Sequence, residues 1–309
     1  MKIVFMGTPD FALPSLTALI QSDNTLCGVV TQPDRLRGRG KKLTPPPVKS
    51  LAGQHGIPVL QPEKVRAEEC VRWLQDRAPD LIVVVAFGQI LPAAVLTIPA
   101  RSCINLHASL LPRYRGASPI NRAIISGDET TGITTMLMNE GMDTGDILLQ
   151  QEVPIAADDD ALSLGRRLSD TGASLLLQTV SRLERNMLHP QPQNDSLASY
   201  APPLKKEDGL IDWTGTARDI HNLIRGTVPW PGAFTHLAHK RFKILKSAIS
   251  EGSDQLPPGT VARAGPEGIQ VVTGRGCLTL TEVQMENRSA MKAGEFLSGH
   301  ALPAGTRLG

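Results

Sequence analysis

The sequence predicts an α/β fold in which a doubly wound, mostly parallel sheet is followed by a small β-barrel. Two observations carry the prediction. In residues 1–189, short apolar runs alternate with amphipathic segments, the pattern of a parallel sheet with helices on both faces. Beyond a stretch rich in Pro, Ser and Asn, short β-like segments follow one another between glycines and prolines, which is typical of a small barrel. A chain of 309 residues has room for both domains.

The strands of the first domain are expected where an apolar run stops at a glycine or a polar residue. The run LIVVVAF at 81–87 is apolar at every position, as in a central strand buried on both faces. Helices are expected where apolar residues recur at helical spacing. In chain order, the expected strands are 2–7, 26–32, 58–62, 81–87, one through Asn105 and His107, and a pair within 130–155, and the expected helices are 9–21, 48–56, 67–80, 91–99, 121–128 and 163–186.

The second domain is expected after a linker. We place the first domain at 1–189 and the linker at 190–206, where Pro, Ser and Asn are frequent. The second domain then covers 207–309. It opens with IDWTGTARDIHNLIRG, expected as one amphipathic helix with Ile220, Leu223 and Ile224 on its apolar face. The barrel strands are expected at 232–238, 241–249, 259–265, 268–274 and 276–284.

The composition is that of an ordinary soluble protein, with 41% apolar residues, 20% charged residues and a net charge of +2. No apolar run approaches the length that crosses a bilayer. The N-terminal MKIVFMG reads as a first strand rather than a signal peptide, so we expect a cytoplasmic protein. The four cysteines form no CxxC pair and no metal-type spacing, so we expect reduced thiols and no metal.

One loop of the first domain is sharply basic. DRLRGRGKKLTPPPVK at 34–49 holds six basic residues and one acid. Such a run is often no more than a solvated loop. It can equally form an arm that follows a phosphate backbone. The six cations are Arg35, Arg37, Arg39, Lys41, Lys42 and Lys49.

Asn105 and His107 lie two apart on a predicted strand, so both project to the same face. Ligands bind at the carboxyl ends of such strands. An imidazole can move protons near neutral pH, and an amide can donate to an oxygen that gains negative charge. The pair predicts acyl transfer to an external nucleophile, although satisfied polar residues are also common at strand ends. A Cys103–His107 nucleophile is disfavoured, because the two residues lie four positions apart on the strand, a separation of about 13 Å.

A third group is expected from GMDTGDI at 141–147, where Asp143 lies in a tight turn between two strands. A carboxylate placed over the strand end could orient the His107 ring. The alternative is that Asp143 only caps its own turn, as Asp often does.

NLHASLLPRYRGASPI followed by GMDTGDI resembles the catalytic core of the folate-dependent formyltransferases. The resemblance implies a Rossmann-like first domain and transfer of a formyl group from 10-formyltetrahydrofolate to an amine. It assigns catalysis to Asn105, His107 and Asp143, with neither a metal nor a covalent enzyme intermediate. Folate would lie against Ser109, Leu110, Leu111 and Pro112, and the pterin pocket would be lined by Phe87, Gly88, Gln89, Ile90 and Leu91 and by Asn139, Glu140 and Gly141. The alternative for SLLP is a turn whose leucines only pack.

The basic loop and the opening of the second domain resemble one branch of the formyltransferase family in particular. TQPDRLRGRGKKLTPPPVK at 31–49 is similar to the loop with which one branch of the family contacts the acceptor end of initiator tRNA, and 211–234 is similar to the start of that branch's oligonucleotide-binding (OB)-type domain. This implies formylation of the methionine carried by initiator tRNA. We also expect a monomer.

Two alternatives stay open. The first is a sister formyltransferase acting on an amino-sugar nucleotide or a purine ribotide. A purine enzyme would not need residues 205–309, and an amino-sugar enzyme would leave the RGRGKK run unexplained. The second is an RNA-binding protein without catalysis, which the Asn105, His107 and Asp143 set argues against.

Overall fold

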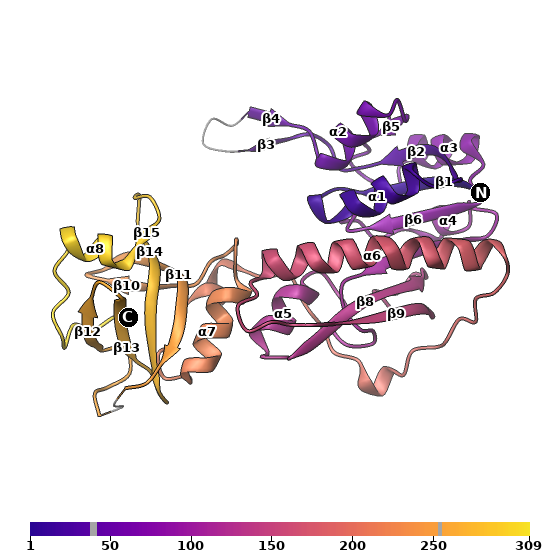
Figure 1. The fold of residues 1–309 in the computed structure, drawn as a ribbon. Helices are drawn as coiled ribbons and strands as arrows, with labels where there is room; N and C mark the ends of the chain where they lie inside the picture. Colours follow the sequence, from indigo (N-terminus) through magenta and orange to yellow (C-terminus); the bar gives the residue numbers. More distant parts are fainter. Residues whose placement is uncertain (38–41, 253–254) are drawn as a thin grey trace. The chain divides into compact units, whose positions relative to one another are not determined.

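The computed structural model describes residues 1–37, 42–252 and 255–309 (Figure 1). Its contacts divide the chain into two compact units that interleave along the sequence. Residues 190–201, expected within a linker, belong to the first unit, and the chain passes to the second unit after Ala201. The first unit comprises Met1–Pro119, Thr130–Pro154 and Gly165–Ala201, and the second comprises Ile120–Glu129, Ile155–Leu164 and Pro202–Gly309.

A seven-stranded sheet forms the first unit, in the order β5-β2-β1-β6-β7-β8-β9. The ladders from β5 to β7 are parallel, and those joining β7, β8 and β9 are antiparallel. The predicted mostly parallel sheet is thereby confirmed. The strands are β1 (Lys2–Gly7), β2 (Thr25–Val30), β5 (Val59–Leu60), β6 (Leu81–Val85), β7 (Ser102–His107), β8 (Thr130–Leu137) and β9 (Ile147–Pro154).

The burial of the strands follows their composition. All five residues of β6 are buried, as its uninterrupted apolar run predicts. The helices of this unit are η1 (Asp10–Ala12), α1 (Leu13–Ile20), α2 (Pro47–Gln54), α3 (Glu68–Arg77), α4 (Ala93–Leu96) and η2 (Asp195–Leu197), with most of α6 (Ala161–Glu184). A Cβ atom at Gly172 of α6 would lie 2.8 Å from Leu106 Cδ2 on β7. This close approach fixes one face of β7 against α6 and leaves the alternate residues, Asn105 and His107, on the other face.

The basic segment is not a featureless loop. Strands β3 (Arg35–Arg37) and β4 (Lys42–Thr44) form an antiparallel ladder in which Leu36 pairs with Leu43. Both leucines are exposed. The loop expected at 34–49 thus contains two short paired strands, each with a leucine between polar residues.

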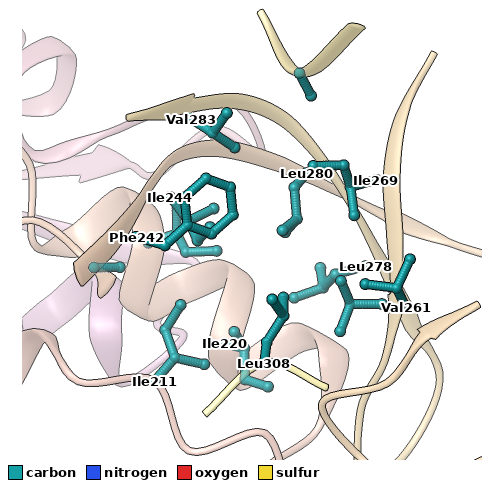
Figure 2. Packing of buried hydrophobic residues seen from close by; sticks show 14 of the residues in the cluster. Ile211, Ile220, Phe242, Ile244, Val261, Ile269, Leu278, Leu280, Val283 and Leu308 are labelled. Atoms are coloured by element: carbon teal, nitrogen blue, oxygen red, sulfur yellow. The ribbon is translucent and has the colours of Figure 1, made fainter. Parts of the chain in front are cut away.

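The second unit contains an antiparallel sheet in the order β10-β11-β14-β13-β12, with β15 paired to β14, as expected for the smaller β domain. Its strands are β10 (Phe234–Leu237), β11 (Lys240–Ser250), β12 (Val261–Gly265), β13 (Gly268–Val272), β14 (Cys277–Met285) and β15 (Met291–Lys292), and its helices are α5 (Pro119–Ile125), η3 (Lys206–Gly209), α7 (Ala217–Gly226) and α8 (Ala293–Gly299). Figure 2 shows Ile220, Phe242 and Leu280 within one buried cluster.

Helix α7 is shorter than the sequence predicts. It begins at Ala217, and the preceding residues 211–216 are not helical. Thr216 Oγ1 accepts from the Asp219 backbone N–H at 3.1 Å, and Asp219 Oδ2 accepts from the Thr216 hydroxyl at 2.7 Å. A threonine followed three residues later by an acid is a capping signal, and it sets the start of the helix.

Candidate active site

The structure brings Asn105, His107 and Asp143 together. Asn105 Nδ2 donates to Asp143 Oδ1 at 3.4 Å, and His107 Nδ1 lies 3.6 Å from Asp143 Oδ2. The two β7 residues share a face because they alternate along the strand. The third comes from the loop between β8 and β9, which folds back over this face.

The shape of that loop follows from its glycines and Asn139. Asn139 Oδ1 accepts from the Gly141 backbone N–H at 3.0 Å and from the Thr144 hydroxyl at 2.9 Å. A Cβ atom at Gly145 would overlap the carbonyl oxygen of Leu137, so this position requires glycine. Asp143 itself has a φ of 53°, a conformation that Asp tolerates better than most residues.

The Asp143 carboxylate does more than cap its own turn. Its Oδ2 atom accepts from the backbone N–H of Gly116 at 2.8 Å. Gly116 lies in the loop after β7, 27 residues away in sequence. The carboxylate therefore connects the β8–β9 loop, the loop after β7 and the β7 side chains.

His107 is buried, with only 6% of its surface exposed. Its Nε2 atom lies 2.9 Å from the carbonyl oxygen of Tyr114. A carbonyl oxygen only accepts, so Nε2 carries the hydrogen in this bond. Nδ1 then faces the Asp143 carboxylate, and a ring protonated on both nitrogens would donate toward both oxygens.

The thiol of Cys103 does not suit a nucleophile. Burial raises the pKa of Cys103 to about 12, and its Sγ atom contacts Leu96 O at 3.7 Å. The thiol therefore stays protonated near neutral pH, and the thiolate is the reactive form. The Cys103–His107 alternative finds no support here.

The residues predicted to bind folate are not all available as side chains. Ser109 is fully buried, and its hydroxyl donates to Arg113 O at 2.6 Å. Gln89 uses its side chain within the protein, because its Oε1 accepts from Val65 N at 2.8 Å. Of the predicted set, Leu111, Phe87 and Leu91 are also buried, Leu110 and Pro112 are half-buried, and Gly88, Ile90, Asn139, Glu140 and Gly141 are exposed.

A pocket of about 310 Å³ opens at the ends of the parallel strands. Its walls include two predicted folate residues, Phe87 and Gly88, and one residue of the basic set, Arg35. Thr8 and Gln32 were not predicted. Their side chains donate to Phe87 O at 3.1 and 3.3 Å. The full lining is Thr8, Pro9, Gln32, Pro33, Arg35, Thr44, Pro46, Ala86, Phe87 and Gly88.

A signal for the two missed residues exists in the sequence. GTPD at 7–10 ends β1, and TQPD at 31–34 ends the neighbouring β2. Each places a polar residue and then proline where a strand stops. Because carboxyl ends of adjacent parallel strands meet at one edge, this repeated pattern marks the edge that ligands use.

The basic residues differ in their surroundings. Arg35 and Lys42 are exposed on β3 and β4. Lys49 lies on α2, and its ammonium contacts both oxygens of Asp34 at 2.8 and 2.9 Å. Hydrogen bonds from Gln61 and Lys49 lower the pKa of Asp34, so the charge of Lys49 is already paired. Arg39, Lys41 and the side chain of Arg37 lie outside the described residues.

Two family matches cover this chain. Residues 1–180 match the family described as formyl transferase, and residues 203–301 match the family described as formyl transferase, C-terminal domain. The chain belongs to the formyl transferase family. The resemblance read from the sequence is confirmed, and the chain is a formyl-group transferase.

Two relatives in this family share about half of their residues with the chain. A methionyl-tRNA formyltransferase of Citrifermentans bemidjiense is 52% identical over all of this chain and 96% of its own. A methionyl-tRNA formyltransferase of Geobacter metallireducens is 53% identical over all of this chain and 99% of its own. The similarity thus runs through both domains.

Solved structures share the fold. An N-formyltransferase from Helicobacter canadensis, in complex with folinic acid and dTDP-3-aminofucose, has a TM-score of 0.66 at 19% identity, covering 94% of this chain and 100% of its own. HypX from Aquifex aeolicus, in complex with tetrahydrofolic acid, has a TM-score of 0.64 at 17% identity, covering 99% of this chain and 50% of its own.

The described residues contain neither a candidate membrane span nor a candidate metal-binding cluster. None of their helices combines the length and apolar character needed to cross a membrane. Within the same residues, His, Cys, Asp and Glu side chains form no group of three or more that could hold a metal ion.

Proposed function

We propose that the chain transfers the formyl group of 10-formyltetrahydrofolate to the α-amino group of methionyl-initiator tRNA, giving N-formylmethionyl-tRNA for translation initiation. The observation that carries the proposal is that Asn105 and His107 both lie beside the Asp143 carboxylate. The chain also matches methionyl-tRNA formyltransferases over its full length. We also propose that it acts in the cytoplasm, where its substrates are used, and that it is a monomer.

The proposed chemistry is a direct transfer between two nitrogen atoms. The amine attacks the formyl carbon, and the carbonyl oxygen gains negative charge. Asn105 donates to that oxygen from its Nδ2 atom. The bond from the carbon to N10 of the folate then breaks, while one proton moves from the attacking amine to N10.

We assign that proton transfer to His107, directly or through an ordered water. Its Nε2 atom is held by Tyr114 O at 2.9 Å, which leaves Nδ1, beside the Asp143 carboxylate, as the ring nitrogen for the transfer. The Asp143 carboxylate, 3.6 Å from Nδ1, stabilises the positive charge that the ring carries during the transfer.

The two substrates are proposed to meet at the strand ends. The folate would lie against residues 109–112 and 139–141, with its pterin near Phe87–Leu91. The pocket described above supports the pterin end of this placement, because Phe87 and Gly88 line it together with Arg35 of β3. Residues 109–112 and 139–141 are not part of its lining. Exposed cations at Arg35 and Lys42 suit the phosphates of an acceptor stem. We propose that the second domain, residues 207–309, is an OB-like domain that also binds the tRNA.

A sugar formyltransferase is the second candidate, since the fold is shared with a solved N-formyltransferase bound to dTDP-3-aminofucose. Replacing His107 by alanine tests the catalytic assignment in either case. We expect formyl transfer to fall by at least about 10² while binding of 10-formyltetrahydrofolate and of tRNA is retained. Full activity in H107A would reject the catalytic site.

A further inference from the structure

The segment expected as a linker packs beside the candidate active site. Gln191 and Ile147 exchange two backbone hydrogen bonds at 2.8 and 2.9 Å, next to the end of the Asp143 loop. Farther along, Arg115 N donates to Ser199 O at 2.8 Å, and Ala201 N donates to Arg115 O at 2.7 Å. The segment therefore lies against both loops that surround the Asp143 carboxylate.

Gln193, in the middle of this segment, joins those two loops through its side chain. Its Nε2 atom donates to Asp143 O at 2.8 Å and to Gly145 O at 2.7 Å. Its Oε1 atom accepts from Arg115 Nε at 3.1 Å and from Arg115 Nη2 at 2.8 Å. Both amide hydrogens and both lone-pair directions of the oxygen are thus used.

Arg115 fixes the other end of this connection. It is only 3% exposed, and its Nη2 atom also donates to Asp195 Oδ1 at 2.7 Å. A guanidinium removed from water needs such partners, so its position is tightly defined. The next residue, Gly116, donates its backbone N–H to Asp143 Oδ2. The 115–116 loop thereby contacts Asp143 in two ways. Gly116 donates to its carboxylate directly, and Arg115 is connected to its backbone carbonyl through Gln193.

We infer that Gln193 is a positioning residue for formyl transfer, which holds the Asp143–Gly145 turn so that the Asp143 carboxylate faces Asn105 and His107. The inference rests on the proposed function. Asp143 has a positive φ, and a turn of this kind persists when its surroundings fix it. Two hydrogen bonds to carbonyls on either side of Thr144 supply that constraint.

The chemistry explains why an amide is needed. Glutamate at this position would satisfy Arg115 but would set a carboxylate oxygen against the carbonyls of Asp143 and Gly145. Leucine has a similar size and would satisfy neither side. Both substitutions should loosen the turn, and a displacement of about 1 Å in a catalytic group can cost about 10² in rate.

The test compares Q193L and Q193E with Q191L, whose wild-type side chain is exposed two residues away. We expect kcat to fall by about 10- to 100-fold in both Gln193 variants, with KM for each substrate within about twofold of wild type. Thermal unfolding measures the folded fraction, so that rates refer to folded enzyme. Activity equal to that of Q191L would overturn the inference.

A double-variant cycle separates positioning from general packing. If Gln193 acts through Asp143, adding Q193L to D143N should cost less than about threefold. A full additional loss in the double variant would mean that Gln193 acts by another route, and the inference would fall.

The inference can also be tested without measuring formyl transfer, so that the result does not depend on which acceptor the enzyme uses. In histidine-labelled protein, the His107 ring signals, assigned with H107Q among the seven histidines, should shift in Q193L and not in Q191L. Unchanged ring signals in Q193L would overturn the inference. Failure of the proposed function would instead appear in the wild-type enzyme, as absence of transfer to initiator tRNA.

Discussion

Replacing Asp143 by asparagine removes one negative charge from the centre of the site and keeps the size of the side chain. The carboxylate oxygen lies 3.6 Å from His107 Nδ1, and the two side chains are 18% and 7% exposed. This separation is too long for a good hydrogen bond, so the expected effect is electrostatic. Two unit charges at this distance attract by about 4–5 kcal/mol at an effective dielectric constant of about 20.

That energy sets the size of the expected loss. As tenfold in rate corresponds to about 1.4 kcal/mol, the full attraction would be worth about 10³ in kcat. Because the asparagine oxygen keeps a partial negative charge, we expect D143N to lose about 10²–10³ in kcat. KM for tRNA should change by less than about threefold, since the charge acts on the reacting groups.

The assay is single-turnover formyl transfer at saturating folate and tRNA, with D146N as the matched control from the same loop. Asp146 holds the loop through its backbone, because Leu137 N donates to Asp146 O at 2.9 Å, so D146N should keep wild-type rates. A D143N enzyme within about threefold of wild type would refute the electrostatic role of this carboxylate.

Three further perturbations follow from the same structure. G145A should lower kcat by at least about tenfold, because its Cβ would overlap the Leu137 carbonyl and displace the Asp143 turn; unchanged kcat would contradict the predicted displacement. K42E should raise KM for tRNA and reduce the salt dependence of binding without affecting folate binding; equal loss of both would show a structural role. Burial lowers the pKa of His221 below its usual value of 6.5, so the folded state disfavours the protonated ring. Stability should fall as pH drops below about 6.5, and H221Q should lose less thermal stability between pH 7 and pH 5.5 than wild type; an equal loss would reject this linkage.

Local patterns predicted most of the first unit and the identity of the residues that meet in the site. The apolar run at 81–87 became the buried strand β6, and alternation placed Asn105 and His107 on one face of β7. The tight turn at Asp143 was predicted from its glycines. These features depend on periodicity and turn chemistry, which a single sequence contains.

Features that depend on distant contacts were not predicted. The composition of 190–206 indicates a linker, yet Gln193 and Arg115 bind each other across 78 residues. No local pattern encodes that pairing. The ladder between β3 and β4 depends on pairing of Leu36 with Leu43, and the pocket depends on Thr8 and Gln32 meeting at the edge of the sheet.

The central claim is the identity of the acceptor, and a comparison of acceptors tests it most directly. The wild-type enzyme would be mixed with 10-formyltetrahydrofolate and, in parallel, with methionylated initiator tRNA, methionylated elongator tRNA and an amino-sugar nucleotide. We predict that formylation is confined to the initiator tRNA. Formylation of the sugar nucleotide alone would keep the chemistry of Asn105, His107 and Asp143 and contradict the tRNA assignment, and absence of transfer to all three would contradict the proposed function itself.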